Sequence, residues 1–392
     1  MWQATTGSAT IYRRSPVVQL PRLNLFRGRS PGGRVVKIEQ GRRGGLVERW
    51  NMDNAEHHIS HSLSAKTHIS DSLPAETHIS HSASDAAGDA LTSHEWPLPL
   101  SPLSGEHAKA VELERALRAE AVMASQPAFA ASDIIYQDQW LIVINKPSGV
   151  YSGHVLSTVS SMFSSQEDHT LSKHEGATES KMHLHLANRL DRDTSGVMIV
   201  TKCKIAAGKL TRMFQSRKAK KTYIAFCIGP RPNWSEVYVE TGHGRSRWGA
   251  WRVYAYEDVG RKLPDNAVVK DMNTRFSVLA VNGERVSGCS CDKNVCERLV
   301  AEKNQSYKNM PAFGDEVLLR AHPSTGRTHQ IRLHCQFLGL PLRGDVKYGG
   351  PLVWKGMNYG IHALHAESMS FRHPITDVSL SFVAPLPDWA VC

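Results

Sequence analysis

The 392-residue sequence has no apolar run long enough to cross a membrane, so a membrane-spanning protein is not expected. Its seven cysteines are too few for a disulfide framework in a chain of this length, and their odd number predicts a reducing compartment. No acidic residue precedes Glu39, although seven Lys and Arg residues do. These absences argue against a disulfide-stabilised secreted protein and direct attention to the basic residues.

The first 50 residues are basic and contain several Ser, Thr and Gly residues, which is typical of an organellar transit peptide. They lack the compact apolar core of a secretory signal. We therefore predict import into a chloroplast or a mitochondrion, and the composition does not choose between the two. The alternative is a disordered basic arm that touches RNA.

Residues 55–84 contain three Ser- and His-rich decapeptides, AEHHISHSLS, AKTHISDSLP and AETHISHSAS. Such segments cannot bury enough apolar surface to offset chain entropy, so residues 51–105 are predicted to be a disordered linker. Their histidines could chelate a metal loosely, but a duplicated low-complexity segment explains them without one. Residues 106–131 are predicted to be a helical lead-in, because residues 106–125 are rich in Ala, Leu and Glu.

The chain has a formal net charge of +10, which favours a polyanionic partner such as RNA. The linker is acidic, and residues 131–392 retain a basic excess of their own. Local patterns in this part predict a surface insertion over 152–182 and a helix over 205–217. They also predict a helix over 328–338 that opens at Thr328 and ends near Gly339.

The most informative stretch is LANRLDRDTSGVMIVTK, residues 186–202. Gly196 permits a tight turn before an apolar run that is typical of a buried strand. Asp191 lies between Arg189 and Arg192, and nearby positive charge favours the ionised carboxylate. An ionised carboxylate on such a loop is a candidate nucleophile or base. From the residues alone, an N-capping Asp in a solvated turn is an equal alternative.

RLDRDTSG resembles the signature of the RluA-type pseudouridine synthases, although Asn188 stands where the family usually has His. The stretches KTYIA (221–225), GRTHQIR (326–332) and LPLRGDVKYGG (340–350) resemble later family motifs in the same order. The resemblance covers about residues 134–389. It implies one catalytic α+β domain, about 132–390, with a mixed, largely antiparallel central sheet and flanking helices.

The resemblance also implies catalytic roles for Asp191, Tyr223 and Arg332. Asp191 would attack the ribose or the base, or stabilise charge at the anomeric carbon. Tyr223 would pack on the flipped uracil and is a candidate proton acceptor, while Arg332 would pair with the catalytic carboxylate. The reaction needs no metal and no cofactor. Without the resemblance, Tyr223 would be interpreted as a strand residue that packs, and Arg332 as a helix residue facing solvent.

Basic and aromatic residues near these motifs are predicted to contact RNA through phosphates and unstacked bases. They are Arg189, Lys218, Lys220, Lys221, Arg245, Arg247, Trp248, Trp251, Arg327 and His329. Arg189 would fill the gap that an extruded base leaves. For residues 242–262, stacking on RNA and internal packing of an aromatic hairpin are equal alternatives.

Cys289, Cys291 and Cys296 form a cluster without a nearby fourth ligand, so reduced thiols are expected rather than zinc. A metal-dependent hydrolase would also need a ligand set that the histidines do not form. We predict a monomeric RNA pseudouridine synthase that modifies specific uridines in organellar rRNA or tRNA, a plant-type organellar member of the family. A non-catalytic RNA-binding protein on the same fold is the alternative.

Overall fold

The computed structural model describes residues 96–102, 104–167, 184–286, 296–303 and 314–391. The predicted transit peptide and the three decapeptides lie outside the described residues, as do Cys289 and Cys291.

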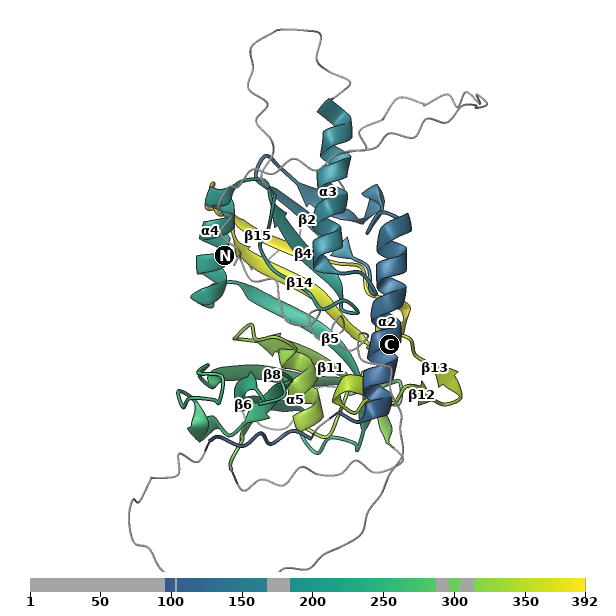
Figure 1. Cartoon of the computed structure of the whole chain (residues 1–392), viewed down its shortest axis with the longest axis vertical. Helices are drawn as coiled ribbons and strands as arrows, with labels where there is room; N and C mark the ends of the chain where they lie inside the picture. The colour runs from purple at the N-terminus through teal and green to yellow at the C-terminus, as the bar shows by residue number, and fades with distance from the viewer. Residues whose placement is uncertain (1–95, 103, 168–183, 287–295, 304–313, 392) are drawn as a thin grey trace, which may run out of the picture. The chain divides into compact units, whose positions relative to one another are not determined.

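Strands dominate the described residues, and helices flank them (Figure 1). The strands are β1 (Ile134–Gln137), β2 (Leu141–Lys146), β3 (His185–Leu186), β4 (Ser195–Thr201), β5 (Lys220–Gly229), β6 (Glu236–Arg245), β7 (Trp251–Tyr254), β8 (Lys270–Val281), β9 (Glu284–Arg285), β10 (Glu297–Val300), β11 (Asp315–Pro323), β12 (Val353–Trp354), β13 (Met357–Asn358), β14 (Leu364–Arg372) and β15 (Ser379–Val383). The α-helices are α2 (Glu106–Ser125), α3 (Ser152–Glu167), α4 (Lys204–Gln215) and α5 (Gln330–Phe337). Short 3-10 turns are η1 (Ala131–Asp133), η2 (Tyr256–Asp258), η3 (Val346–Tyr348) and η4 (Asp388–Ala390).

One large sheet follows the order β1-β2-β4-β14-β5-β11-β8-β6-β10, and β15, β3, β7 and β9 pair along its sides. Among the described strands, the pairs β14–β4 and β10–β6 are parallel and the other pairs are antiparallel. The predicted α+β fold with a mixed, largely antiparallel sheet is confirmed.

Strand β4 is buried on both faces, as its apolar run predicted. Val197 and Ile199 point into a core shared with α4, β14 and β15. Met198 and Val200 point to the opposite face, where α3 contributes Val155. Successive side chains of a strand alternate between faces, so an uninterrupted apolar run fills two cores at once.

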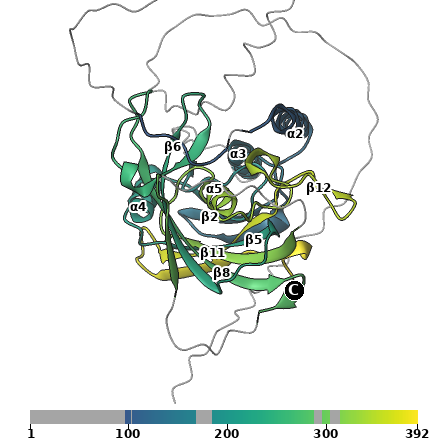
Figure 2. The same ribbon diagram turned by 90° about the horizontal axis from the view of Figure 1, so that it is seen from below.

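Helix α5 covers the other half of the sheet, above β11 and β8 (Figure 2). Its apolar side chains Ile331 and Cys335 join a core formed with β5, β6, β8 and β11. The polar side chains of the same short helix divide: Gln330 and His334 bond to β8, whereas Arg332 reaches Asp191. This placement brings a residue of α5 close to the loop before β4.

Two predicted helices and one predicted surface insertion can be compared with the structure. The helix over 106–125 is confirmed, and the helix over 205–217 is found as α4. The predicted surface insertion over 152–182 is wrong in its first half, because residues 152–167 form α3 and bury Val155 and Val159. Those valines stand four residues apart and therefore share one helical face.

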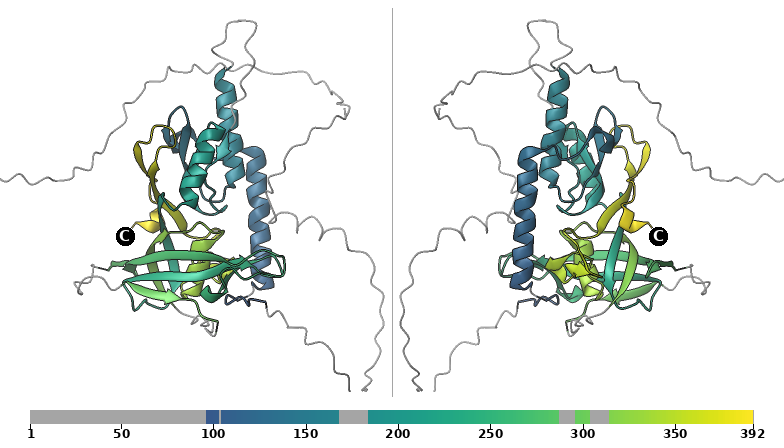
Figure 3. Two further views of the ribbon diagram at one scale, coloured as in Figure 1. Left: turned by 90° about the vertical axis from the view of Figure 1, so that its left-hand side faces the viewer. Right: turned by 90° about the vertical axis from the view of Figure 1, so that its right-hand side faces the viewer.

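The predicted linker and lead-in pack more closely than expected. Leu100 donates a backbone hydrogen bond to Val253 on β7, and Ser101 is buried. Helix α2 runs lengthwise beside the sheet in Figures 1 and 3 and contacts η3. Residues 96–125 are thus part of the folded domain. Among the described residues, every helix is too short or too polar to cross a membrane.

Candidate active site

The loop between β3 and β4 carries Asp191, and the start of β4 fixes where that loop lies. Gly196 has a φ of +107°, and a Cβ at this position would lie 2.2 Å from the carbonyl oxygen of Ala366. Any larger residue would collide with the backbone of β14. The glycine is therefore needed for a close approach between two strands rather than for the predicted turn.

Polar side chains tie the loop to its surroundings. The Asn188 side-chain oxygen accepts a hydrogen bond from the Ile199 backbone N–H at 2.8 Å, and its amide nitrogen lies 3.5 Å from the Val197 carbonyl oxygen. An amide offers both a donor and an acceptor, so Asn188 can brace the loop at the position where the family usually has His. Below the loop, the buried Lys146 ammonium donates to the Arg192 carbonyl at 2.9 Å.

Asp191 and Arg332 form an ion pair, in which Nη1 of Arg332 donates to Oδ2 of Asp191 at 3.0 Å. The two side chains are 24% and 6% exposed. Burial by itself raises the pKa of Asp191, but the adjacent His329, Arg332 and His362 outweigh it and hold that pKa well below its usual range.

Arg332 is the cation that matters for Asp191 at neutral pH. Burial lowers the pKa of His329 to about 3 and the pKa of His362 to about 4, so both imidazoles are uncharged at pH 7. The sequence placed Asp191 between Arg189 and Arg192, but in the structure Arg192 is paired with Asp193 and Arg189 is exposed at the rim of the cleft. The contact of Arg332 with the carboxylate, which the resemblance implied, is present.

A second carboxylate fixes Arg332 from the other side. Its Nε and Nη2 donate to Oδ2 and Oδ1 of Asp345 at 2.7 and 2.8 Å. The guanidinium carbon also lies 4.9 Å from the ring centre of Tyr348. A planar guanidinium held by a bidentate contact and an aromatic face has little freedom to rotate, so its remaining N–H is aimed at Asp191.

His329 belongs to the same cluster. It precedes α5 in the left-handed conformation, with a φ of 57°, and the helix begins at Gln330; the predicted opening at Thr328 was therefore wrong. Nδ1 of His329 lies 2.7 Å from the Tyr348 hydroxyl, and Nε2 lies 3.8 Å from Oδ1 of Asp191. A residue predicted to contact RNA thus borders the carboxylate directly.

The residues after Asp191 have partners of their own. Arg192 donates from Nε and Nη2 to the two oxygens of Asp193 at 2.7 and 2.9 Å. The Thr194 hydroxyl lies 2.8 Å from Nε2 of His362, whose Nδ1 is 4.0 Å from Asp193. These contacts hold the loop in place and leave Asp191 facing Arg332.

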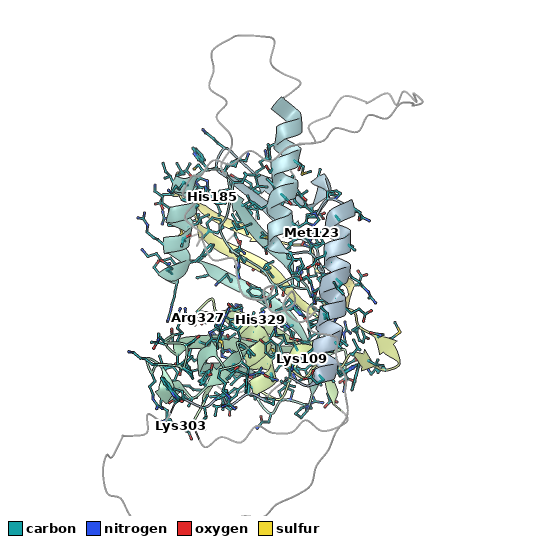
Figure 4. The ribbon with its side chains drawn as sticks, in the orientation of Figure 1. Lys109, Met123, His185, Lys303, Arg327 and His329 are labelled. Atoms are coloured by element: carbon teal, nitrogen blue, oxygen red, sulfur yellow. The ribbon has the colours of Figure 1, made fainter. Side chains whose placement is uncertain are left out.

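A cleft of about 460 Å³, partly open to solvent, lies over the ion pair. Its lining residues are Arg189, Leu190, Asp191, Thr194, Lys221, Tyr223, Pro323, Thr325, Gly326, Arg327, His329, Gln330, Ile331, Arg332 and Leu364. Figure 4 labels Arg327 and His329, which lie together at the start of α5. All three predicted catalytic residues therefore meet in one cleft, although they are far apart in the sequence.

Tyr223 enters the cleft from β5, opposite Ala321 of β11. Burial, followed by the charge of Asp191, raises the pKa of its phenol above the usual value. Tyr223 is therefore neutral at pH 7. A neutral ring suits the expected packing against a base better than it suits the expected proton acceptance.

The residues predicted to contact RNA divide into three groups. Arg189, Lys221, Arg327 and His329 line the cleft. Lys218 and Lys220 are exposed beside it, at the start of β5, and the others lie on the β6–β7 hairpin. Binding of RNA by any of them stays a prediction.

Both interpretations of the aromatic hairpin describe part of it. The Trp251 ring stacks on His243, with 4.7 Å between ring centres, and the Arg245 guanidinium lies 4.7 Å from it. Trp251 is thus engaged inside the protein. Trp248 is 67% exposed and contacts Arg247 at 4.7 Å, so this ring is accessible to an unstacked base.

Three features of the site had no clear signal in the sequence. Asp345 and Tyr348 lie in the quoted LPLRGDVKYGG stretch but were not singled out, and His362 has no motif at all. In the described part of the chain, no three His, Cys, Asp or Glu side chains are grouped to hold a metal ion. Cys296 is exposed, and its two predicted neighbours lie outside the described residues.

Comparisons with known proteins give the following matches. Residues 140–337 match the family described as RNA pseudouridylate synthase. A protein named RNA pseudouridine synthase 1 from Oryza sativa is 47% identical over 300 residues, which is 76% of this chain and 84% of that protein. The protein of the same name from Arabidopsis thaliana is 45% identical over 299 residues, 75% of this chain and 87% of that protein. Ribosomal large subunit pseudouridine synthase D from Vibrio parahaemolyticus is 28% identical over 274 residues, 65% of this chain and 67% of that protein.

Proposed function

Because this chain belongs to the RluA-type RNA pseudouridine synthases and is an isomerase that acts on RNA, we propose that the cleft around Asp191 is its active site. One observation carries the proposal: Asp191 is kept ionised by Arg332, which Asp345 clamps in turn. A half-buried carboxylate with a strongly perturbed pKa, in a cleft, is typical of a reactive group.

The reaction breaks the bond between N1 of uracil and C1′ of ribose and forms a bond between C5 and C1′. The hydrogen on C5 leaves as a proton, and N1 gains one. Asp191 serves this rearrangement as a nucleophile toward the ribose or the base, or as a negative charge that stabilises the anomeric carbon. Each of these roles requires the anion, which Arg332 maintains at neutral pH.

The walls of the cleft suit a base that has left its helix. Tyr223 offers a neutral ring for stacking, and Arg189 at the rim can occupy the place of the extruded base. Lys221 and Arg327 in the same lining supply positive charge for the flanking phosphates.

We further propose that the substrate is rRNA or tRNA of a chloroplast or a mitochondrion. The composition of residues 1–50 supports import into an organelle. The name of the Vibrio relative refers to the large ribosomal subunit, which supports rRNA as one substrate class. We also propose that the protein acts as a monomer, because Asp191, Arg332 and Asp345 contact one another directly within the chain.

Mapping pseudouridine in total RNA from cells with and without the protein tests the substrate proposal. We expect specific uridines of organellar RNA to lose the modification, and loss confined to cytosolic RNA would contradict it. A fusion of residues 1–50 to a fluorescent reporter tests the location separately. Signal in an organelle is expected, and diffuse signal would favour the basic-arm interpretation.

A further inference from the structure

Helix α2 lies before the segment 140–337 that matches the family, yet its side chains reach the groups that fix the ion pair of the cleft. Figure 4 labels Lys109 and Met123 toward the two ends of this helix, which passes alongside both halves of the sheet. Its inner face carries Glu112 and Arg115, whereas Glu114 and Arg118 form an exposed pair on the same helix.

Arg115 binds the turn that precedes Asp345. Its side chain is 6% exposed, and it donates to the carbonyl oxygens of Gly344 and Tyr359 at 2.9 and 2.8 Å. Gly344 stands next to Asp345 in the chain, and a Cβ at Gly344 would lie 2.1 Å from the Ile361 carbonyl oxygen. The turn is therefore tightly packed, and Arg115 secures it from the outer side.

Glu112 connects this turn to the loop of Asp191. One of its oxygens accepts from Arg115 at 2.9 Å, and the other accepts from Nη2 of Arg192 at 3.3 Å. Arg192 follows Asp191 directly and is bound to Asp193. A continuous path of charged contacts thus joins the two backbone segments that hold the carboxylate of Asp191 and the support of Arg332.

We propose that Glu112 and Arg115 are positioning residues, which set the distance between the Asp191 loop and the Asp345 turn and thereby keep Arg332 aimed at Asp191. This inference rests on the proposed role of Asp191. Displacing a reacting group by about 1 Å can cost on the order of 100-fold in rate, so a brace outside the cleft can matter for the chemistry. If Glu112 and Arg115 only stabilised helix α2, any pair of opposite charges at these two positions would serve equally well.

Two matched charge swaps in the full chain separate these roles. Glu112→Arg with Arg115→Glu keeps an intrahelical pair, but it places like charge beside Arg192 and a carboxylate against the carbonyls of Gly344 and Tyr359. Glu114→Arg with Arg118→Glu makes the same exchange in the exposed pair. Both variants keep the composition and the net charge of the protein.

The readout is tritium release from RNA labelled with [5-³H]uridine and prepared from cells that lack the protein, under single-turnover conditions. We expect the inner swap, Glu112→Arg with Arg115→Glu, to lower the rate constant by at least about tenfold. The dissociation constant for RNA should change by less than about threefold. The outer swap, Glu114→Arg with Arg118→Glu, should leave the rate constant and the dissociation constant within about twofold of the wild-type values. Circular dichroism measures the folded fraction at the assay temperature.

The inference is overturned if the folded inner swap reacts at the wild-type rate, or if its loss of rate merely follows the loss of folded protein. If the inner swap does not fold, Glu112→Gln provides the test instead. This variant keeps an acceptor oxygen and removes the charge, and we expect its rate constant to fall by about threefold. An unchanged rate in Glu112→Gln would then refute the brace. Asp191→Asn in the same assay tests the proposed function, because an active Asp191→Asn variant defeats that proposal whatever the swaps do.

Discussion

The interior of the cleft and the β6–β7 hairpin both place arginines against aromatic rings, but they hold these arginines differently. Arg332 lies 4.9 Å from the Tyr348 ring and is also bound to two carboxylates, with its side chain 6% exposed. Arg247 lies 4.7 Å from the ring of Trp248, and both of these side chains are exposed. A contact between an arginine and an aromatic ring is therefore fixed in one region and free to rearrange in the other.

The energetic difference suits two different tasks. Removing one partner of a buried ion pair costs about 3–5 kcal/mol, so the Asp191–Arg332 geometry is set before RNA arrives. An exposed cation–π contact contributes about 0.5–1 kcal/mol, so Arg247 can leave Trp248 for a phosphate at little cost. We infer that the interior is built for chemistry and the hairpin for adaptable recognition. The following changes would break or sharpen that division.

Arg332→Lys should have the largest effect. One ammonium cannot contact Asp191 and both oxygens of Asp345 together, so we expect the single-turnover rate to fall by about 100-fold with RNA binding retained. A rate within about threefold of wild type would mean that positive charge alone suffices.

The pH dependence of the same variant adds a sharper test. The pKa of Asp191 lies well below its usual range, so its carboxylate is ionised above that value and the wild-type rate should not decline on its account between about pH 8 and 5. Weakening the pair in Arg332→Lys raises this pKa toward its ordinary value. The variant should therefore lose rate as the pH falls below about 5, toward that ordinary value of 3.8, where the wild type keeps its ionised Asp191, and an identical profile in that range would contradict the role of Arg332.

Trp248→Ala should weaken RNA binding while the rate at saturating RNA stays unchanged. Loss of stacking on one base costs about 1–3 kcal/mol, or roughly 5- to 150-fold in the dissociation constant. Trp251→Ala is the matched comparison, because Trp251 is engaged with His243 and should affect thermal stability more than affinity. We also expect Trp248→Ala to alter which uridines are modified, as mapped on total RNA.

Replacing Lys218 and Lys220 by Gln should change the salt dependence and not the choice of uridine. Each phosphate contact on single-stranded RNA contributes about −0.7 to the slope of log affinity against log salt, so the slope should flatten by roughly 1 to 1.5. Lys109 and Lys303, labelled in Figure 4, provide a control with the same loss of charge. If the variant lacking Lys218 and Lys220 keeps the wild-type salt slope but modifies different uridines, the proposed division between phosphate-binding lysines and base-stacking aromatic residues is refuted.

Asp271→Asn should have the smallest effect, and in the opposite direction. Asp271 accepts from Arg327 at 2.7 Å and is also paired with Arg217, so it occupies two arginines, of which Arg327 lines the cleft. Removing its charge frees them for phosphates, and we expect affinity for RNA to rise by about two- to fivefold at low salt. A fall in affinity would show that Asp271 aims these arginines.

The sheet and the meeting of Asp191, Tyr223 and Arg332 were predicted through the resemblance of the ordered motifs to a known family, whereas the apolar runs by themselves only permitted the sheet. The sequence did not predict which groups surround them. Asp345 lies in a quoted motif but was not singled out, and nothing in the sequence indicates that the guanidinium of Arg332 contacts two carboxylates. Glu112 and Arg115 were indistinguishable from solvent-facing charges of an Ala-rich helix, since their partners lie far along the chain.

The helix start at α5 shows a similar limit. Thr328 is a favourable cap by composition, but the helix begins after His329, whose left-handed backbone is set by contacts with Tyr348 and the Asp191 loop. Tertiary contacts decided this boundary, and local propensity could not reveal it. In α3, by contrast, the four-residue spacing of Val155 and Val159 was present in the sequence and was outweighed by the surrounding serines.

The central claim is that chemistry depends on the ionised carboxylate of Asp191. Its most direct test is tritium release from [5-³H]uridine-labelled RNA by Asp191→Asn, which removes the charge and keeps nearly the same shape. The account predicts no release above background, while circular dichroism and the dissociation constant for RNA stay close to those of the wild type. Release at a rate within about tenfold of wild type would contradict it.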